Sequence, residues 1–298
     1  MKAQLLYQTT NITGEGVAWL SSTKKLLWVD IEGKTLYIMD VDSGIVKSNR
    51  FDKMPSTIIP YKDKDEIIIL GLENKLVTYN LETEEELTLI DLSDLPQDLR
   101  TNDGKASPDG QIFMGIMHLT NHNETGLVLR IDKDLSVKTV LDKESIPNGM
   151  VWDSTGESFY YVDSAKSRIM RYEYNLKTGA ISNPQIVVKV PKEYGVPDGM
   201  TIDTEGRLWV AHWGGFGVYI WNTETGHLEG KIEVPAPHVA SCTFGGKDMD
   251  TLYITTARAG LSDADLLKYP LSGSLFSVKT NSKGGVNHYP FQPKAICL

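Results

Sequence analysis

Three oxygen-bearing side chains occupy the same place in three similar stretches of the sequence. Glu15, Asn148 and Asp198 each stand directly before a glycine. Two carboxylates and one amide carbonyl form a set of hard oxygen donors, and the two negative charges would balance a divalent cation. A metal held in this way can polarise a carbonyl group or activate water. A single Asn-Gly or Asp-Gly pair is more often only a turn, so the prediction depends on the shared position.

These stretches belong to a longer internal repeat. Residues 147–153 and 197–203 match in order, each is followed by another glycine and an apolar run, and they are 50 residues apart. Looser copies begin near Glu15, Pro55, Asn102 and Val239. Each unit contains about four short runs typical of β-strands, with turn sequences between them, and a period of roughly 40–50 residues is typical of a propeller blade.

The repeat predicts an all-β fold, a six-bladed β-propeller of four-stranded blades around a central channel, formed by one domain over residues 1–298. The first strand of each blade would line the channel, so equivalent residues of different blades would converge there. We expect the ring to close through pairing of residues 4–8 with residues 274–279, which protects the strand edges. Only residues 262–267 suggest a helical turn. A pair of β-sandwiches is the alternative, and the repeat argues against it.

The charge balance excludes some classes of partner. The chain has 30 Lys and Arg against 39 Asp and Glu, a formal net charge of −9. An acidic surface argues against sequence-independent nucleic-acid binding and against docking on anionic lipid. No apolar stretch approaches the roughly 18 residues of a membrane span, and no secretory signal is evident. We therefore expect a cytoplasmic protein; Cys242 and Cys297 indicate no disulfide framework, and the oligomeric state is open.

Several short motifs occur along nearly the whole chain, at residues 14–19, 100–105, 148–149, 198–200, 203–211, 241–246, 250–257 and 273–276. In this order they resemble the motifs of the family that contains gluconolactonase, senescence marker protein (regucalcin) and luciferin-regenerating enzyme. The resemblance implies a six-bladed propeller with one divalent metal at the channel mouth, and an activity that hydrolyses lactones.

The resemblance also implies roles for individual residues. Glu15, Asn148 and Asp198 match the protein ligands of the metal. Arg100 and Asn102 match substrate-binding residues, and Asp103 is interpreted as support for their loop.

Two places leave the substrate site open. Some members that act on sugar lactones carry a glutamate where this chain has Thr120, and Glu124 is the nearby candidate to replace it. This difference puts a sugar-acid substrate in question without affecting the metal. His212 and Trp213 follow an inner strand in the repeat. His212 could face the channel, although a loop or packing role is more common for a lone histidine. Trp213 could border the substrate, and an ordinary exposed loop is the alternative.

The function predicted from the sequence is metal-dependent hydrolysis of a small-molecule lactone, such as gluconolactone, or of a related cyclic ester. Asp198 is both a metal ligand and the candidate general base for the attacking water. Oxygen ligands suit Ca²⁺ best, with Mg²⁺, Mn²⁺ or Zn²⁺ as alternatives. Two other functions stay open: a non-catalytic calcium-binding or scaffold propeller, and a propeller hydrolase acting on aryl esters or phosphotriesters.

Overall fold

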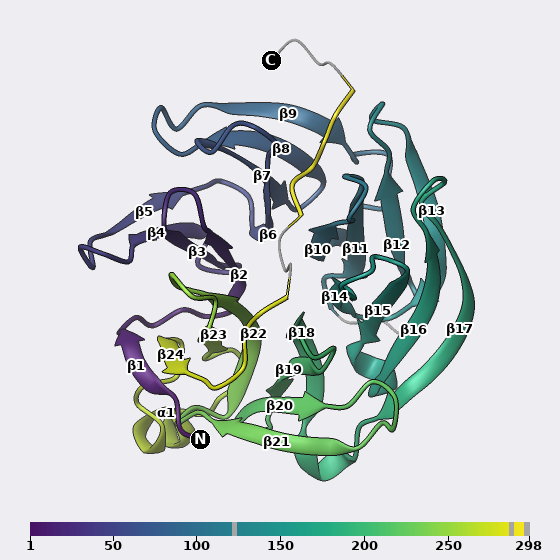
Figure 1. Ribbon diagram of the computed structural model, residues 1–298. Helices are drawn as coiled ribbons and strands as arrows, with labels where there is room; N and C mark the ends of the chain where they lie inside the picture. The colour runs from purple at the N-terminus through teal and green to yellow at the C-terminus, as the bar shows by residue number, and fades with distance from the viewer. Residues whose placement is uncertain (121–123, 286–288, 295–298) are drawn as a thin grey trace.

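Short β-strands arranged around a central axis make up most of the computed structural model, which describes residues 1–120, 124–285 and 289–294 (Figure 1). Four sheets contain four antiparallel strands each, paired in chain order. Their strands are β2 (Gly14–Leu20), β3 (Lys25–Asp30), β4 (Thr35–Asp40) and β5 (Val46–Arg50); β6 (Pro55–Pro60), β7 (Ile67–Leu72), β8 (Lys75–Asn80) and β9 (Glu86–Asp91); β10 (Leu99–Ala106), β11 (Ile112–His118), β12 (Gly126–Ile131) and β13 (Val137–Glu144); β14 (Pro147–Trp152), β15 (Ser158–Asp163), β16 (Arg168–Asn175) and β17 (Ala180–Lys189).

The remaining strands form one eight-stranded sheet. It contains β18 (Val196–Ile202), β19 (Leu208–Trp213), β20 (Gly217–Trp221), β21 (Leu228–Glu233), β22 (His238–Gly245), β23 (Thr251–Ala257), β24 (Leu275–Lys279) and β1 (Gln4–Tyr7).

The prediction of six separate four-stranded blades is therefore wrong. The finding that overturns it is a direct pairing of β19 with β22, through the backbones of Trp213 and His238, which merges strands expected in two blades into one sheet. The physical reason is local: β19 reaches Trp213, and the indole of Trp213 stacks on the His238 imidazole with ring centroids 4.3 Å apart. The propeller-like arrangement around an axis is retained (Figure 1).

The core lies between neighbouring sheets. Phe113 of β11, Trp152 of β14 and Phe159 of β15 are almost fully buried, with ring centroids 4.6 to 5.3 Å apart. Strands such as β15 are buried over their whole length, whereas the outermost strands, such as β9, are largely exposed. Each sheet therefore needs its neighbours to bury its faces, which explains the predicted repeat of short units.

The prediction for ring closure is confirmed. β1 pairs antiparallel with β24, with Gln4 opposite Ser277 and Leu5 opposite Phe276, so the chain start covers a strand edge near the chain end. The expected helical turn is also present as α1 (Asp263–Lys268), where Ser262 forms a capping box with Asp265. Two short 3₁₀ helices complete the elements, η1 (Ser164–Lys166) and η2 (Lys192–Tyr194).

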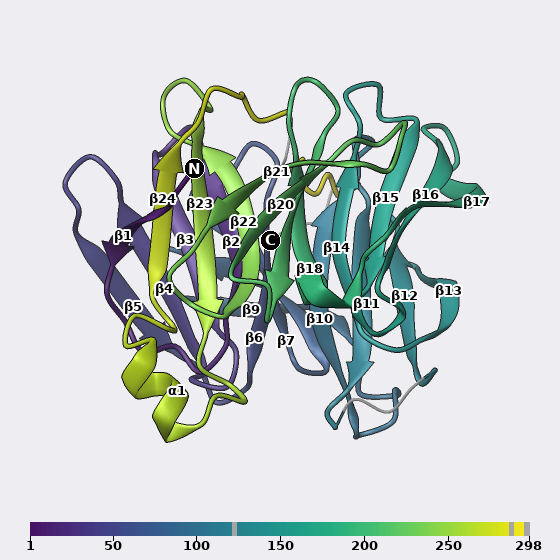
Figure 2. The ribbon, with the colours of Figure 1, turned by 90° about the horizontal axis from the view of Figure 1, so that it is seen from below.

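The chain after β24 crosses one face of the molecule, on the side opposite α1 (Figures 1 and 2). Its backbone hydrogen-bonds to the far ends of inner strands and turns: Gly285 donates to the Ile202 carbonyl at 2.9 Å, and Gln292 donates to that of Gly110 at 3.1 Å. Phe291 is fully buried against Tyr61. This segment therefore covers the face formed by the carboxyl ends of the inner strands.

Two other features bear on the sequence predictions. Cys242 is a buried free cysteine, and Cys297 lies outside the described residues. Within the ranges that the structure describes, no helix has the length and apolar character needed to cross a membrane.

Candidate active site

The three residues expected to hold a metal lie at β-bulges at the start of inner strands. The pairing register shifts within residues 15–18 of β2, 148–150 of β14 and 197–200 of β18. A bulge adds an unpaired residue to a strand and changes the direction of its side chain. The repeated glycine is therefore part of a repeated bulge at the same end of the three strands.

The glycines themselves allow neighbouring inner strands to approach closely. A Cβ atom on Gly149 would lie 2.6 Å from the carbonyl oxygen of Asp198, and one on Gly199 would lie 2.9 Å from Ser241 Oγ. The alternative that these pairs are simple turns is wrong, because both glycines lie inside strands. Glycine is required here for close approach, and that approach brings the backbones of β14 and β18 together beside Asn148 and Asp198.

All five residues proposed from the sequence line one cavity. It has a volume of about 370 Å³, and Glu15, Arg100, Asn102, Asn148 and Asp198 all contribute to its wall. The cavity lies at the amino ends of the inner strands, opposite the face that the C-terminal segment covers. Its volume is at the lower end of the range for small-molecule sites.

The acidic groups of the site repel one another. Burial, followed by the charge of Asp103, raises the pKa of Glu15 to about 8. Burial, followed by Glu15 and Asp103, raises the pKa of Asp198 well above its ordinary value. A cation placed among these groups would relieve both the repulsion and the loss of hydration. The electrostatics therefore fit a positively charged ligand.

Two oxygen atoms of the site have no protein partner. Asn148 Oδ1 and Asp198 Oδ1 are buried, and neither makes a hydrogen bond within the described part of the chain. Buried polar atoms are nearly always satisfied, so an orphaned pair of acceptors suits a ligand cation. The described residues contain no group of three or more His, Cys, Asp or Glu side chains placed to hold a metal. The set here has two carboxylates, and an amide oxygen is the third donor.

Ser164 determines which end of the Asn148 amide faces the cavity. Asn148 Nδ2 donates to Ser164 Oγ at 3.0 Å, which leaves Oδ1 as the unpartnered atom. Ser164 is the first residue of η1, and Asp163 caps this turn by accepting from the Ala165 N–H at 3.2 Å. The capped turn therefore places the hydroxyl that orients the amide.

Arg100 and Asn102 form a second connected pair in the wall. Arg100 Nη1 donates to Asn102 Oδ1 at 2.9 Å and to the Thr101 carbonyl at 2.8 Å. Asn102 Nδ2 donates to the Pro147 carbonyl at 2.9 Å, so the asparagine connects β10 to β14. Burial lowers the pKa of the Arg100 guanidinium. With its Nη1 directed to Asn102, Arg100 still places a cationic group in the cavity wall.

The candidates to replace a substrate-binding glutamate lie away from the cavity. Thr120 is exposed, and both its N–H and its hydroxyl contact His118 Nδ1 at 3.0 Å. Glu124 is exposed and its N–H donates to Ser145 Oγ. Neither residue lines the cavity, and residues 121–123 between them lie outside the described residues.

His212 and Trp213 have different environments. His212 is fully buried, stacks on Tyr219 with centroids 4.1 Å apart, and has Nδ1 2.9 Å from the Tyr194 carbonyl. Burial lowers its pKa to about 4, so the ring is neutral and serves packing. Trp213 lines the cavity and stacks on His238.

Asp103 and Lys105 were not expected to matter for the electrostatics of the site. Both line a small void in the channel below the cavity, of about 10 Å³. Burial raises the pKa of Asp103 and lowers that of Lys105, and each charge opposes the effect of burial on the other. The two residues are two positions apart in the sequence, a spacing that places side chains on one face of a regular strand.

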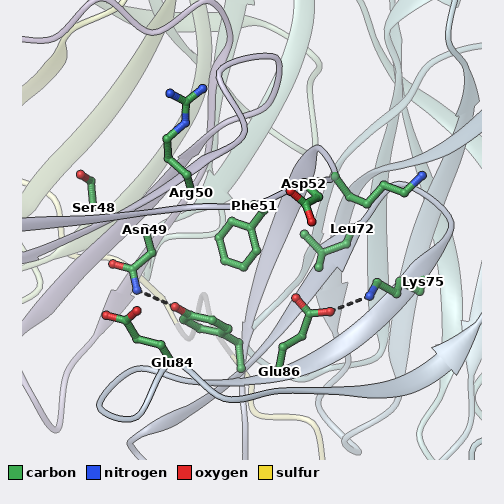
Figure 3. A pocket seen from close by; sticks show the side chains of 11 residues that line it. Ser48, Asn49, Arg50, Phe51, Asp52, Leu72, Lys75, Glu84 and Glu86 are labelled. Carbon is green, nitrogen blue, oxygen red and sulfur yellow. Dashed lines mark hydrogen bonds and ion pairs between the residues drawn. The ribbon is translucent and has the colours of Figure 1, made fainter.

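A larger cavity, of about 660 Å³, lies on the outside of the molecule between β5 and β8 (Figure 3). Two pairs of its polar groups are bonded to each other: Asn49 Nδ2 donates to the Tyr79 hydroxyl, and Lys75 Nζ forms an ion pair with Glu86. It lacks the convergent unpaired oxygens of the channel mouth, so the smaller cavity is the better candidate for chemistry.

The chain is similar to known proteins over almost its whole length. Residues 13–258 match the model of the SMP-30/Gluconolactonase/LRE-like region. A Bacillus subtilis protein named "Putative sugar lactone lactonase YvrE" is 34% identical, with 98% of this chain and 99% of that protein covered. Regucalcin of Danio rerio is 30% identical, with 98% of each chain covered. A solved structure described as a calcium-binding protein, regucalcin, from Agrobacterium tumefaciens superposes with a TM-score of 0.91 at 23% identity, covering 98% of this chain and 97% of the other, which supports the fold.

Proposed function

Because the chain belongs to the SMP-30/gluconolactonase/LRE-like family, we propose that it is an enzyme that opens the ring of a lactone by hydrolysis in a metal-dependent reaction. The named lactonase among its relatives, aligned over almost the whole of both chains, supports the reaction class. The observation that carries the proposal is the presence of two buried, unpartnered oxygens beside two mutually repelling carboxyl groups in one cavity.

We propose that Glu15, Asn148 and Asp198 hold one divalent cation. Their donors are all oxygens, which favours Ca²⁺, and the name regucalcin among the relatives agrees with this choice. Mg²⁺, Mn²⁺ and Zn²⁺ remain alternatives that a titration can separate. The chemistry that a bound divalent cation supplies at such a site is Lewis-acid polarisation of a carbonyl oxygen.

The protein groups have separate tasks in this proposal. Asp198 lines the cavity beside the other proposed ligands and accepts a proton from the attacking water. Arg100 places positive charge in the wall, where it can orient the ring oxygen or a polar substituent of the substrate. Asn102 holds Arg100 in place through its hydrogen bond.

The test is acid release from lactones, followed at constant pH. The protein is first treated with EDTA and then supplied with Ca²⁺, Mg²⁺, Mn²⁺ or Zn²⁺ alone, with δ-valerolactone and glucono-δ-lactone as substrates. We expect turnover that EDTA abolishes and one cation restores, and Asp198→Asn should reduce it by at least about a thousandfold. Asp42→Asn, at an exposed carboxylate in an ion pair with Lys24, is the control and should retain activity.

Three results would contradict parts of this proposal. Activity unaffected by EDTA would exclude the metal, and an Asp198→Asn protein with normal turnover would exclude the assigned base. Tight cation binding without turnover of any lactone would support a non-catalytic calcium-binding propeller instead. A small-molecule lactone is the proposed partner, and the cytoplasmic location stays a prediction.

A further inference from the structure

Apolar side chains make up much of the lining of the active-site cavity. The larger ones include Ile31, Met117, Leu119, Val196 and Trp213. Leu119 is 46% exposed and Val196 is 37% exposed, so both present apolar surface to solvent. Exposed apolar side chains around a concave site indicate a surface that binds an apolar group. We name this set of five residues the apolar wall.

Few polar groups in the cavity are free to bind additional hydroxyl groups. The amide of Asn102 donates to the Pro147 carbonyl and accepts from Arg100. The Ser164 hydroxyl accepts from Asn148 Nδ2. Outside the proposed metal ligands, the polar lining side chains that remain are those of Thr13, Glu32 and Arg100. These few groups would bind only some of the hydroxyl groups of a polyhydroxylated ligand, and each hydroxyl placed against an apolar side chain would cost free energy.

The volume of the cavity, which is open to solvent, indicates how large a part of a ligand it can enclose. At about 30 Å³ for a water-sized group, 370 Å³ accommodates roughly a dozen such groups. A six-membered lactone with its carbonyl oxygen has seven non-hydrogen atoms, which leaves space for a substituent of roughly five more. With the carbonyl beside the proposed metal ligands, such a substituent would fit against side chains of the apolar wall.

From these observations, and resting on the proposed lactonase function, we propose that the substrate is a lactone whose ring bears an apolar substituent, a short alkyl chain or an aryl group, rather than a polyhydroxylated sugar lactone. The apolar wall receives the substituent, and Arg100 and the proposed metal ligands lie beside the ester group. Burial of the substituent supplies the binding energy that distinguishes the two substrate classes.

The experiment compares three lactones with the same ring size. Values of kcat/KM are measured for δ-valerolactone, which has no substituent, δ-decalactone, which has a pentyl chain, and glucono-δ-lactone, with correction for spontaneous hydrolysis. Each methylene buried is worth about a fourfold increase in kcat/KM. We expect δ-decalactone to exceed δ-valerolactone by at least about tenfold, and to exceed glucono-δ-lactone as well.

Two variants connect this preference to the apolar wall. Val196→Thr changes shape little, and Leu119→Asn replaces a half-exposed side chain, so neither should prevent folding. Each should lower the ratio of kcat/KM for δ-decalactone to that for δ-valerolactone by about threefold or more. The matched control is Ile45→Asn, an apolar side chain that is 63% exposed and distant from the cavity, and its ratio should equal that of the wild type.

The outcomes separate this inference from the function on which it rests. A higher kcat/KM for glucono-δ-lactone than for δ-decalactone, or equal values for δ-decalactone and δ-valerolactone, would overturn the substrate class and leave the lactonase activity intact. An unchanged ratio in both wall variants would also overturn it. A protein that opens none of the three lactones with any of the four cations would overturn the proposed function itself.

Discussion

Replacement of Ser164 by alanine tests how the site obtains its third oxygen donor. Ser164 and Asn148 are 4% and 5% exposed, and the hydrogen bond between them is 3.0 Å long. Without the hydroxyl, the Asn148 amide N–H loses its partner and the amide can rotate, presenting NH₂ in place of Oδ1 to a cation. The unsatisfied donor costs about 2 kcal/mol, which corresponds to a roughly 30-fold weaker Kd for the cation.

Isothermal titration of EDTA-treated protein with Ca²⁺, or with the cation that best restores activity, measures this change. Ser164→Thr keeps the hydroxyl and should bind within a few-fold of the wild type. Ser107→Ala is the matched control, because Ser107 is equally buried and its hydroxyl donates to Asp109 at 2.7 Å, at a different position in the fold. It should lower the melting temperature without changing the Kd.

A double-mutant cycle separates orientation of the amide from general damage. A carboxylate has two equivalent oxygens, so in an Asn148→Asp background the side chain no longer has a wrong orientation. Adding Ser164→Ala to that background should weaken cation binding by less than about fivefold. A Ser164→Ala protein with wild-type affinity, or an equal loss in both backgrounds, would refute the orienting role.

Three further predictions concern charge, core and ring closure. In the metal-free protein the pKa of Glu15 is raised from 4.5 to about 8, so between these pH values the folded state retains a proton that the unfolded chain has lost. The stability of the metal-free protein should therefore fall as the pH rises through this window. Glu15→Gln should reduce this fall, measured as the melting temperature in EDTA from pH 5 to 8. Phe113→Ala should lower the free energy of unfolding by about 3–5 kcal/mol in urea titrations, because Phe113 is fully buried among aromatic rings, and a loss below 1 kcal/mol would contradict that packing. Deletion of residues 1–8 should uncover the edge of β24, lower the melting temperature and promote aggregation measurable by light scattering, whereas unchanged behaviour would show that this edge needs no cover.

The strands could be predicted because their signal is local. The expected ranges Lys25–Asp30, Thr35–Asp40 and Ser158–Asp163 coincide with β3, β4 and β15. Apolar and β-branched residues between turn sequences report on a strand from its own composition. The division into sheets could not be predicted in the same way, because a single backbone pair between Trp213 and His238 joins two groups of strands. Nothing in either segment alone records that contact.

Some features of the candidate site also follow from the sequence alone, and others depend on the fold. The amino-acid sequence alone determined the repeat, the oxygen-bearing side chains at its start and the glycines beside them, since these are properties of neighbouring residues. The tertiary structure decided that the glycines allow close strand approach, that Ser164 directs the amide of Asn148, that Asp103 raises the pKa values of Glu15 and Asp198, and that apolar side chains line the same cavity. Hydrogen bonds, charge interactions and cavity walls depend on distances between residues far apart in the chain, and only the packed fold sets those distances.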